Sequence, residues 1–81
     1  MMYSAKVSIL LKPGIADPQG QTIERALPAL GYDGVKNVRV GKQIDLEVEA
    51  DDVESARTRV LEMCERLLAN PVIEAYEVRV Q

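Results

Sequence analysis

Apolar and polar residues alternate along residues 5–12, AKVSILLK, and this pattern predicts a strand with one buried face. Ala5, Val7, Ile9 and Leu11 share that face. Pro13 and the glycine after it should end the strand, because proline has no N–H to donate to a neighbouring strand.

The apolar period changes after Asp17, and the new spacing predicts a helix that runs to about residue 30. Asp17 is a suitable N-cap, Pro18 fits the first helical position, and Gly31 is a suitable stop. The predicted apolar stripe consists of Ile23, Ala26, Leu27 and Leu30. Pro28 lies off this stripe and should bend or loosen the last turn, because it removes the bond to the carbonyl of Glu24.

Residues 35–50, VKNVRVGKQIDLEVEA, contain two alternating runs and predict a hairpin. The two runs bury the same face only if Val40 pairs with Ile44. That pairing requires an odd loop, Gly41 to Gln43, or a bulge.

The spacing of Asp51 and Glu54 resembles a capping box and predicts a second helix from there to about Ala69. Residues 72–80, VIEAYEVRV, then alternate again and predict a fourth strand. The apolar stripe of this helix consists of Ala56, Val60, Met63, Cys64, Leu67 and Leu68.

The predicted order of elements is βαββαβ within a single domain, residues 1–81. Right-handed crossovers then give an α+β fold, a ferredoxin-like sandwich with a four-stranded antiparallel sheet and both helices on one face. The other face is left for water or a partner. Leu10, Ile73 and Ala75 should project from it, and they are our candidates for self-association.

Composition narrows the function. The 81 residues carry a formal net charge of -3, with no His, no Trp and no Phe. An acidic chain without a basic cluster or stacking aromatics is not expected to bind nucleic acid. No apolar stretch is long enough for a membrane span, and no leader is evident, so we expect a cytoplasmic protein. A domain of this size buries only about 60% of its unfolded surface, which favours oligomerisation.

The sequence offers little for catalysis. Cys64 lies on the apolar stripe of the second helix, and no histidine could activate it, so we interpret it as a core residue. Helix capping explains the Asp51, Asp52 and Glu54 cluster better than a metal site does. We therefore expect no catalytic residue, no cofactor and no metal on this chain.

The segment DPQG, residues 17–20, has two interpretations that spacing alone leaves open. It is either a helix start with a tolerated glycine, or a place where Gly20 admits close approach by a ligand or another chain. The Gly41-Lys42 segment likewise has two interpretations, a simple turn or a contact with a ligand or partner. A small-molecule-sensing module of the ACT type shares the predicted topology, and its anion could bind at this helix start, so it remains an alternative.

Several short motifs, taken in order, resemble one family. DPQG, then Ala26-Leu27, LGY at residues 30–32, VRVGK at 38–42 and MCERLLANPVIE at 63–74 resemble the small PurS subunit of phosphoribosylformylglycinamidine synthase. The resemblance covers about residues 5–80. Pro28 departs from the family pattern, which usually continues the helix there.

The resemblance implies a non-catalytic assembly subunit in the fourth step of de novo purine synthesis. That step converts formylglycinamide ribonucleotide, glutamine and ATP to the amidine. The implied partners are a second copy, in a dimer or tetramer, a glutaminase subunit, and a large synthetase subunit that holds ATP and Mg²⁺. The chain would bridge the two larger subunits and could aid ammonia transfer. We expect docking at Asp17, Pro18, Gln19 and Gly20, with Arg39, Gly41 and Lys42 as a second contact.

Overall fold

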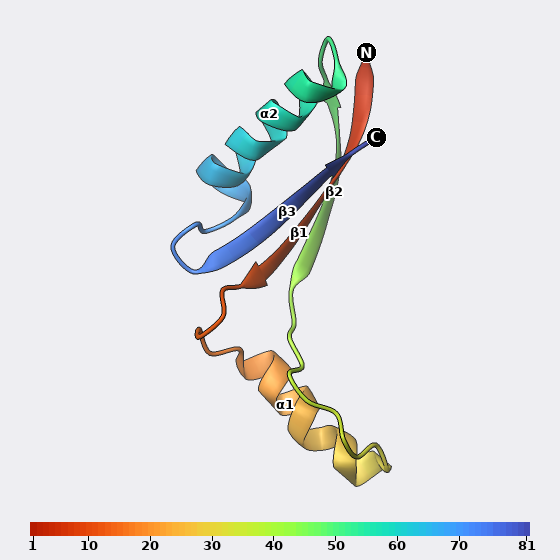
Figure 1. Cartoon of the computed structure of the whole chain (residues 1–81), viewed down its shortest axis with the longest axis vertical. Helices are drawn as coiled ribbons and strands as arrows, with labels where there is room; N and C mark the ends of the chain where they lie inside the picture. Colours follow the sequence, from red (N-terminus) through yellow and green to blue (C-terminus); the bar gives the residue numbers. More distant parts are fainter.

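A computed structural model describes all 81 residues, Met1–Gln81. The element order is β1 (Met2–Leu11), α1 (Pro18–Ala26), the 3₁₀ segment η1 (Leu27–Leu30), β2 (Lys42–Glu49), α2 (Val53–Met63), the π-helical segment η2 (Cys64–Leu68) and β3 (Glu74–Val80). Figure 1 shows α2 beside the strands, and α1 beyond one end of them.

The sheet has three antiparallel strands in the order β2-β1-β3, so the predicted four-stranded ferredoxin-like sandwich is wrong. The missing strand is the one predicted over residues 35–40. Ile9 pairs with Lys42, and continuing this register would place Val38 opposite Pro13, which has no N–H to donate. Residues 35–41 form no strand, because the Val38 and Val40 N–H groups bind the carboxylates of Glu24 and Asp17 rather than a neighbouring strand. The predicted odd loop from Gly41 to Gln43 does not form either.

The core lies between one face of the sheet and α2. Val7, Val60 and Cys64 are completely buried there. The predicted alternation of β1 and of β3 is correct, as is most of the predicted stripe of α2. Leu67 is an exception, because it is 83% exposed on η2. The N-cap of α2 is Asp52 rather than Asp51, and its side chain accepts the Ser55 N–H at 2.7 Å.

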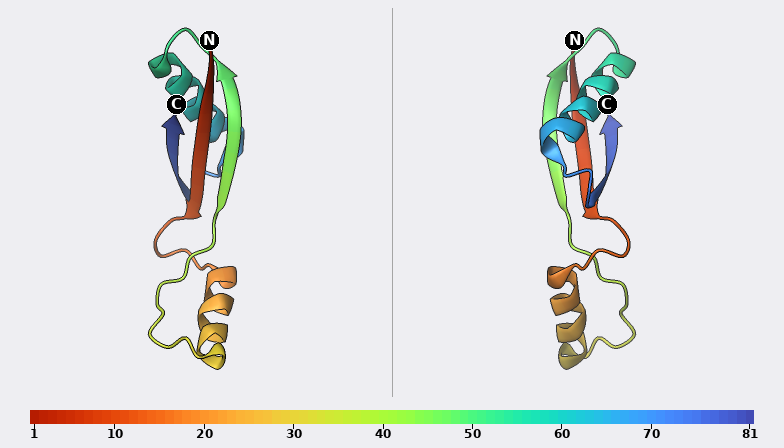
Figure 2. Two further views of the ribbon diagram at one scale, coloured as in Figure 1. Left: turned by 90° about the vertical axis from the view of Figure 1, so that its right-hand side faces the viewer. Right: turned by 90° about the vertical axis from the view of Figure 1, so that its left-hand side faces the viewer.

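The first helix does not cover the sheet. Figure 2 shows α2 against one face of the strands, whereas α1 extends away from their end. We call residues 18–37 the arm, and we call the two crossing segments that connect it to the sheet, residues 12–17 and 38–41, the neck. The predicted stripe on α1 is therefore largely open, with Ile23 44% and Leu30 72% exposed.

The two ends of α1 and η1 follow the sequence prediction. Asp17 caps α1 with Pro18 in its first turn, and Gly31 ends η1 with a left-handed φ of 94°. The predicted loosening at Pro28 is confirmed, because the helix narrows to 3₁₀ geometry over Leu27–Leu30.

The shape is unusually long for 81 residues. The molecule measures 51 × 25 × 14 Å, and its radius of gyration is 16.2 Å. A compact domain of this length would have a radius of gyration of about 12 Å. The projecting arm accounts for this excess.

Candidate functional site

The neck contains an open cleft of about 290 Å³ between the end of the sheet and the start of α1. Its lining residues are Ile9, Leu11, Asp17, Pro18, Gln19, Val40, Gly41, Lys42 and Glu74. A more apolar groove continues from it along the arm and adds Thr22 and Ile23. Two segments that are distant in sequence therefore form one concave surface.

Most of the docking residues predicted from the sequence meet at this cleft. Asp17, Pro18 and Gln19 line it from the helix start. Gly41 lines it from the second neck segment, residues 38–41, which we also call the return segment, and Lys42 lines it from the start of β2. The remaining two, Gly20 and Arg39, lie beside it rather than in its wall.

The Asp17 carboxylate is buried at the centre of the neck and is 7% exposed. Its Oδ1 accepts the Gly20 N–H at 3.0 Å, and its Oδ2 accepts the Val40 N–H at 2.7 Å. Arg39 lies 3.8 Å from the same Oδ2. The Gly20 N–H, then the Val40 N–H and, to a smaller extent, Arg39 lower the pKa of Asp17, although its burial opposes them.

Gly20 is buried, and the backbone of this same chain approaches it closely. A Cβ added at this position would overlap the carbonyl oxygen of Val38 and lie 2.7 Å from Oδ2 of Asp17. The need for glycine at position 20 is thus explained within the chain, and a large substitution there would distort the neck itself.

The geometry of the helix start also bears on the ACT-like alternative. The Gly20 N–H at the first turn of α1 already binds the Asp17 carboxylate. A second negative charge at this position would be repelled by that carboxylate, so the structure offers no support for an anion at this helix start.

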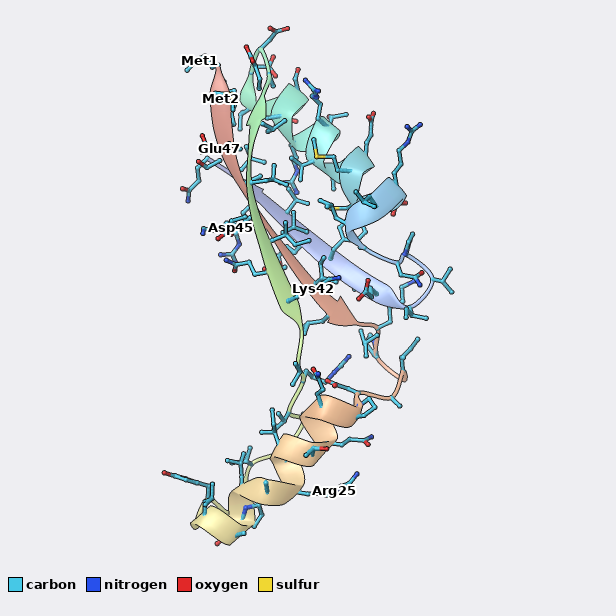
Figure 3. The ribbon with its side chains drawn as sticks, turned by 180° about the vertical axis from the view of Figure 1, so that it is seen from behind. Met1, Met2, Arg25, Lys42, Asp45 and Glu47 are labelled. Carbon is cyan, nitrogen blue, oxygen red and sulfur yellow. The ribbon has the colours of Figure 1, made fainter.

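The three candidates for self-association lie together on the open face of the sheet. Leu10 and Ala75 are direct cross-strand partners, and the Ile73 carbonyl accepts the Lys12 N–H just beyond them. Leu10 is 44% exposed and Ile73 37%. Figure 3 shows that Asp45 and Glu47 also point away from α2, so this face is mixed in polarity.

Sequence reasoning missed two residues that contact the neck or line its cleft. The Glu24 carboxylate reaches from α1 to accept the Val38 N–H at 3.0 Å, and Glu74 completes the wall of the cleft. Glu74 could have been found from the register, because it pairs with Leu11 at the end of β1. No sequence signal marks the contact of Glu24.

The structure contains no group of metal-binding side chains and no helix long and apolar enough to cross a membrane. Cys64 is fully buried, and burial raises the pKa of its thiol, which opposes formation of a nucleophilic thiolate.

A family model described as PurS, phosphoribosylformylglycinamidine (FGAM) synthase, matches residues 4–81 of the sequence. The chain belongs to the PurS family. The PurS subunit of Methanocaldococcus jannaschii is 49% identical over 99% of this chain and 96% of its own length. The PurS subunit of Bacillus subtilis is 44% identical, over 99% of this chain and 94% of its own length.

The fold is shared with solved PurS-family structures. A chain of the PurLQS structure from Thermotoga maritima superimposes with a TM-score of 0.91 at 42% identity, covering 100% of this chain and 99% of that one. The three-stranded sheet and its projecting arm are therefore part of a fold that this relative also has.

Proposed function

We propose that this chain is a non-catalytic assembly subunit of an FGAM synthase complex, an ATP-dependent ligase that takes its nitrogen from glutamine. The main support is its end-to-end likeness to a chain of the Thermotoga maritima PurLQS structure. The absence of histidine and the burial of Cys64 agree with a subunit that supports chemistry carried out elsewhere. ATP and Mg²⁺ would then bind to the large synthetase subunit.

The neck cleft is the proposed docking site for the large synthetase subunit. It is concave, it joins the sheet to the arm, and its wall combines apolar side chains with the charges of Lys42 and Glu74. Pro18, Gln19, Gly41 and Lys42 would touch the partner, whereas Asp17 is buried and would support this contact through its bonds to the Gly20 and Val40 N–H groups. Gly20 and Arg39 would support them from behind, because Gly20 is buried and Arg39 donates to the Leu11 carbonyl.

A second copy of this chain would cover the arm. The arm exposes Ile23, Leu30, Tyr32 and Val35, which is a large apolar surface for 20 residues that have no sheet beneath them. Leu10, Ile73 and Ala75 on the open face would add to the contact. Association would remove from water the apolar side chains that the elongated monomer leaves exposed.

The docking proposal can be tested by filling the cleft. Gln19 is exposed at the first turn of α1, and Gln19→Trp should block the cleft without disturbing the core. Thr58→Trp is the matched control, because Thr58 is equally exposed on a helix but lies on α2, far from the neck. Binding to the cognate synthetase subunit is measured by size-exclusion chromatography with light scattering.

We expect Gln19→Trp to weaken this binding at least about tenfold, which is typical of a disrupted interface centre, and Thr58→Trp to leave it unchanged. Equal binding by the two variants would contradict docking at the neck. Failure of the wild-type chain to enter the complex would contradict the assembly function itself.

A further inference from the structure

The neck is held together by side chains rather than by the hydrogen-bond ladder of the sheet. The backbone pairing of β1 with β2 ends at Ile9 and Lys42, before the chain reaches the arm. Beyond that point the two neck segments are connected by the Val40 N–H, which Oδ2 of Asp17 accepts at 2.7 Å, and by Arg39, which lies 3.8 Å from the same oxygen and donates to the Leu11 carbonyl.

The Asp17 side chain bonds to a residue much further along the chain than an ordinary N-cap side chain does. Asp52 caps α2 and accepts one local N–H, from Ser55. Asp17 likewise accepts a local N–H, but its second oxygen bonds to Val40, 23 residues further along the chain. One buried carboxylate thus ties the end of the first neck segment, the start of α1 and the second neck segment to one another.

Two neighbouring contacts make this tie specific. The Glu24 carboxylate accepts the Val38 N–H at 3.0 Å, so the return segment is bound to α1 at a second point. The Val38 carbonyl packs where a Cβ of residue 20 would lie, which only glycine permits. The return segment is therefore seated against the helix start at Asp17, Gly20 and Glu24.

We propose that Asp17 is a positioning residue that holds the arm at a fixed angle to the sheet, so that the neck cleft and the apolar surface of the arm are presented together. This inference rests on the proposed assembly function for its consequence, but its geometry belongs to the free chain. Asp17 acts through the backbone positions of Gly20 and Val40, and need not touch any partner.

The angle of the arm can be measured in the full-length protein. Spin labels at Arg25→Cys on the arm and Thr58→Cys on α2 report the distance between the two parts by double electron–electron resonance. Figure 3 shows Arg25 pointing outward from α1, and Thr58 is exposed. Cys64 is completely buried, so it stays unlabelled. Dilution with unlabelled protein removes distances between copies.

The decisive variant is Asp17→Asn, because its amide keeps one acceptor oxygen and replaces the other with an NH₂ group that cannot accept an N–H. Asp52→Asn is the matched control at the other N-cap. We expect a single narrow distance for the wild type and for Asp52→Asn. For Asp17→Asn we expect a broadened distribution, with the displaced arm populated roughly tenfold more than in the wild type.

A second measurement separates positioning from general damage. In the reconstituted complex, Asp17→Asn should raise the concentration of this chain needed for half-maximal glutamine-dependent turnover about tenfold. The maximal rate at saturation should not change. If Asp17→Asn does not fold, Gly20→Ala disturbs the same contacts from the other side, since its Cβ would overlap the Val38 carbonyl oxygen and crowd Oδ2 of Asp17.

An undisturbed distance distribution in Asp17→Asn would overturn the inference. The positioning role would be overturned if Asp17→Asn displaced the arm but left the concentration of this chain needed for half-maximal turnover unchanged. If the wild-type chain does not support turnover at all, the assembly function fails, while the distances in the free chain still decide whether Asp17 fixes the arm.

Discussion

Leu30, at the far end of the arm, gives a quantitative test of the proposed contact between copies. Its side chain is 72% exposed in the single chain, so Leu30→Ala should change the stability of the fold by less than about 0.5 kcal/mol. Full burial of a leucine side chain contributes about 1.5–3 kcal/mol. With most of the surface of Leu30 still accessible, covering it in a dimer would contribute about 1–2 kcal/mol.

Both copies in a symmetric dimer carry the substitution, so loss of the two contributions predicts a dissociation constant for self-association raised roughly 30- to 900-fold. The constant is measured by sedimentation velocity over a dilution series. Leu67→Ala is the matched control, because Leu67 is 83% exposed on η2, at a distance from the arm. The reasoning is refuted if Leu30→Ala dissociates at the wild-type concentration, or if both variants weaken association equally.

Three other predictions concern the single chain. Val60→Ala truncates a completely buried side chain and should lower the free energy of unfolding by about 2–3 kcal/mol, which corresponds to a melting temperature lower by roughly 10–20 °C. Val53 is 45% exposed, so the control Val53→Ala should have almost no effect in the same thermal melts. In the folded state the pKa values of Asp17 and Asp52 are lowered from the ordinary 3.8, chiefly by the N–H groups of Gly20 and Ser55 respectively. The two ionised carboxylates therefore stabilise the fold above about pH 4, and this stabilisation is lost as the pH falls through the lowered pKa values. Asp17→Asn and Asp52→Asn should therefore each flatten the acid side of a plot of melting temperature against pH, and a plot as steep as the wild type's would contradict this. Cys64 should react with a thiol reagent only when the protein unfolds, and fast labelling in the absence of denaturant would show that the core is open.

The strands that could be predicted from the sequence are those with one buried face. In β1 and β3 the alternation reflects a real difference between the core face and the open face, as at Val7 and Val78. Val38 and Val40 alternate in the same way, yet they form no strand. Alternation cannot reveal that their N–H groups bind the carboxylates of Glu24 and Asp17 instead of a neighbouring strand.

The amphipathic pattern of α1 was correct for helix formation but misleading for its location. Ile23 and Leu30 form an apolar stripe, and the natural expectation is that the stripe covers the chain's own sheet. The structure leaves that stripe exposed on the arm. Periodicity indicates that an apolar helix face is stabilised by burial. It does not indicate whether the face is buried against the same chain or against another one.

Five of the seven docking residues predicted from the sequence line the neck cleft, but the contacts that hold the neck in place were not predicted. Asp17 was expected to cap α1 and does so, but its bond to Val40 spans 23 residues and has no local sequence signal. Gly20 was expected to admit another chain, whereas the Val38 carbonyl of this chain occupies the space. Such long-range contacts depend on the path of the return segment, which the misassigned strand had placed elsewhere.

The central claim, that this chain is required for assembly of an FGAM synthase, is tested most directly by glutamine-dependent amidine formation. The cognate synthetase and glutaminase subunits are assayed with and without this chain, and light scattering follows the size of the complex in the same samples. We expect turnover from glutamine only when the chain is present and has entered the complex. Equal turnover and equal complex size without it would contradict the account.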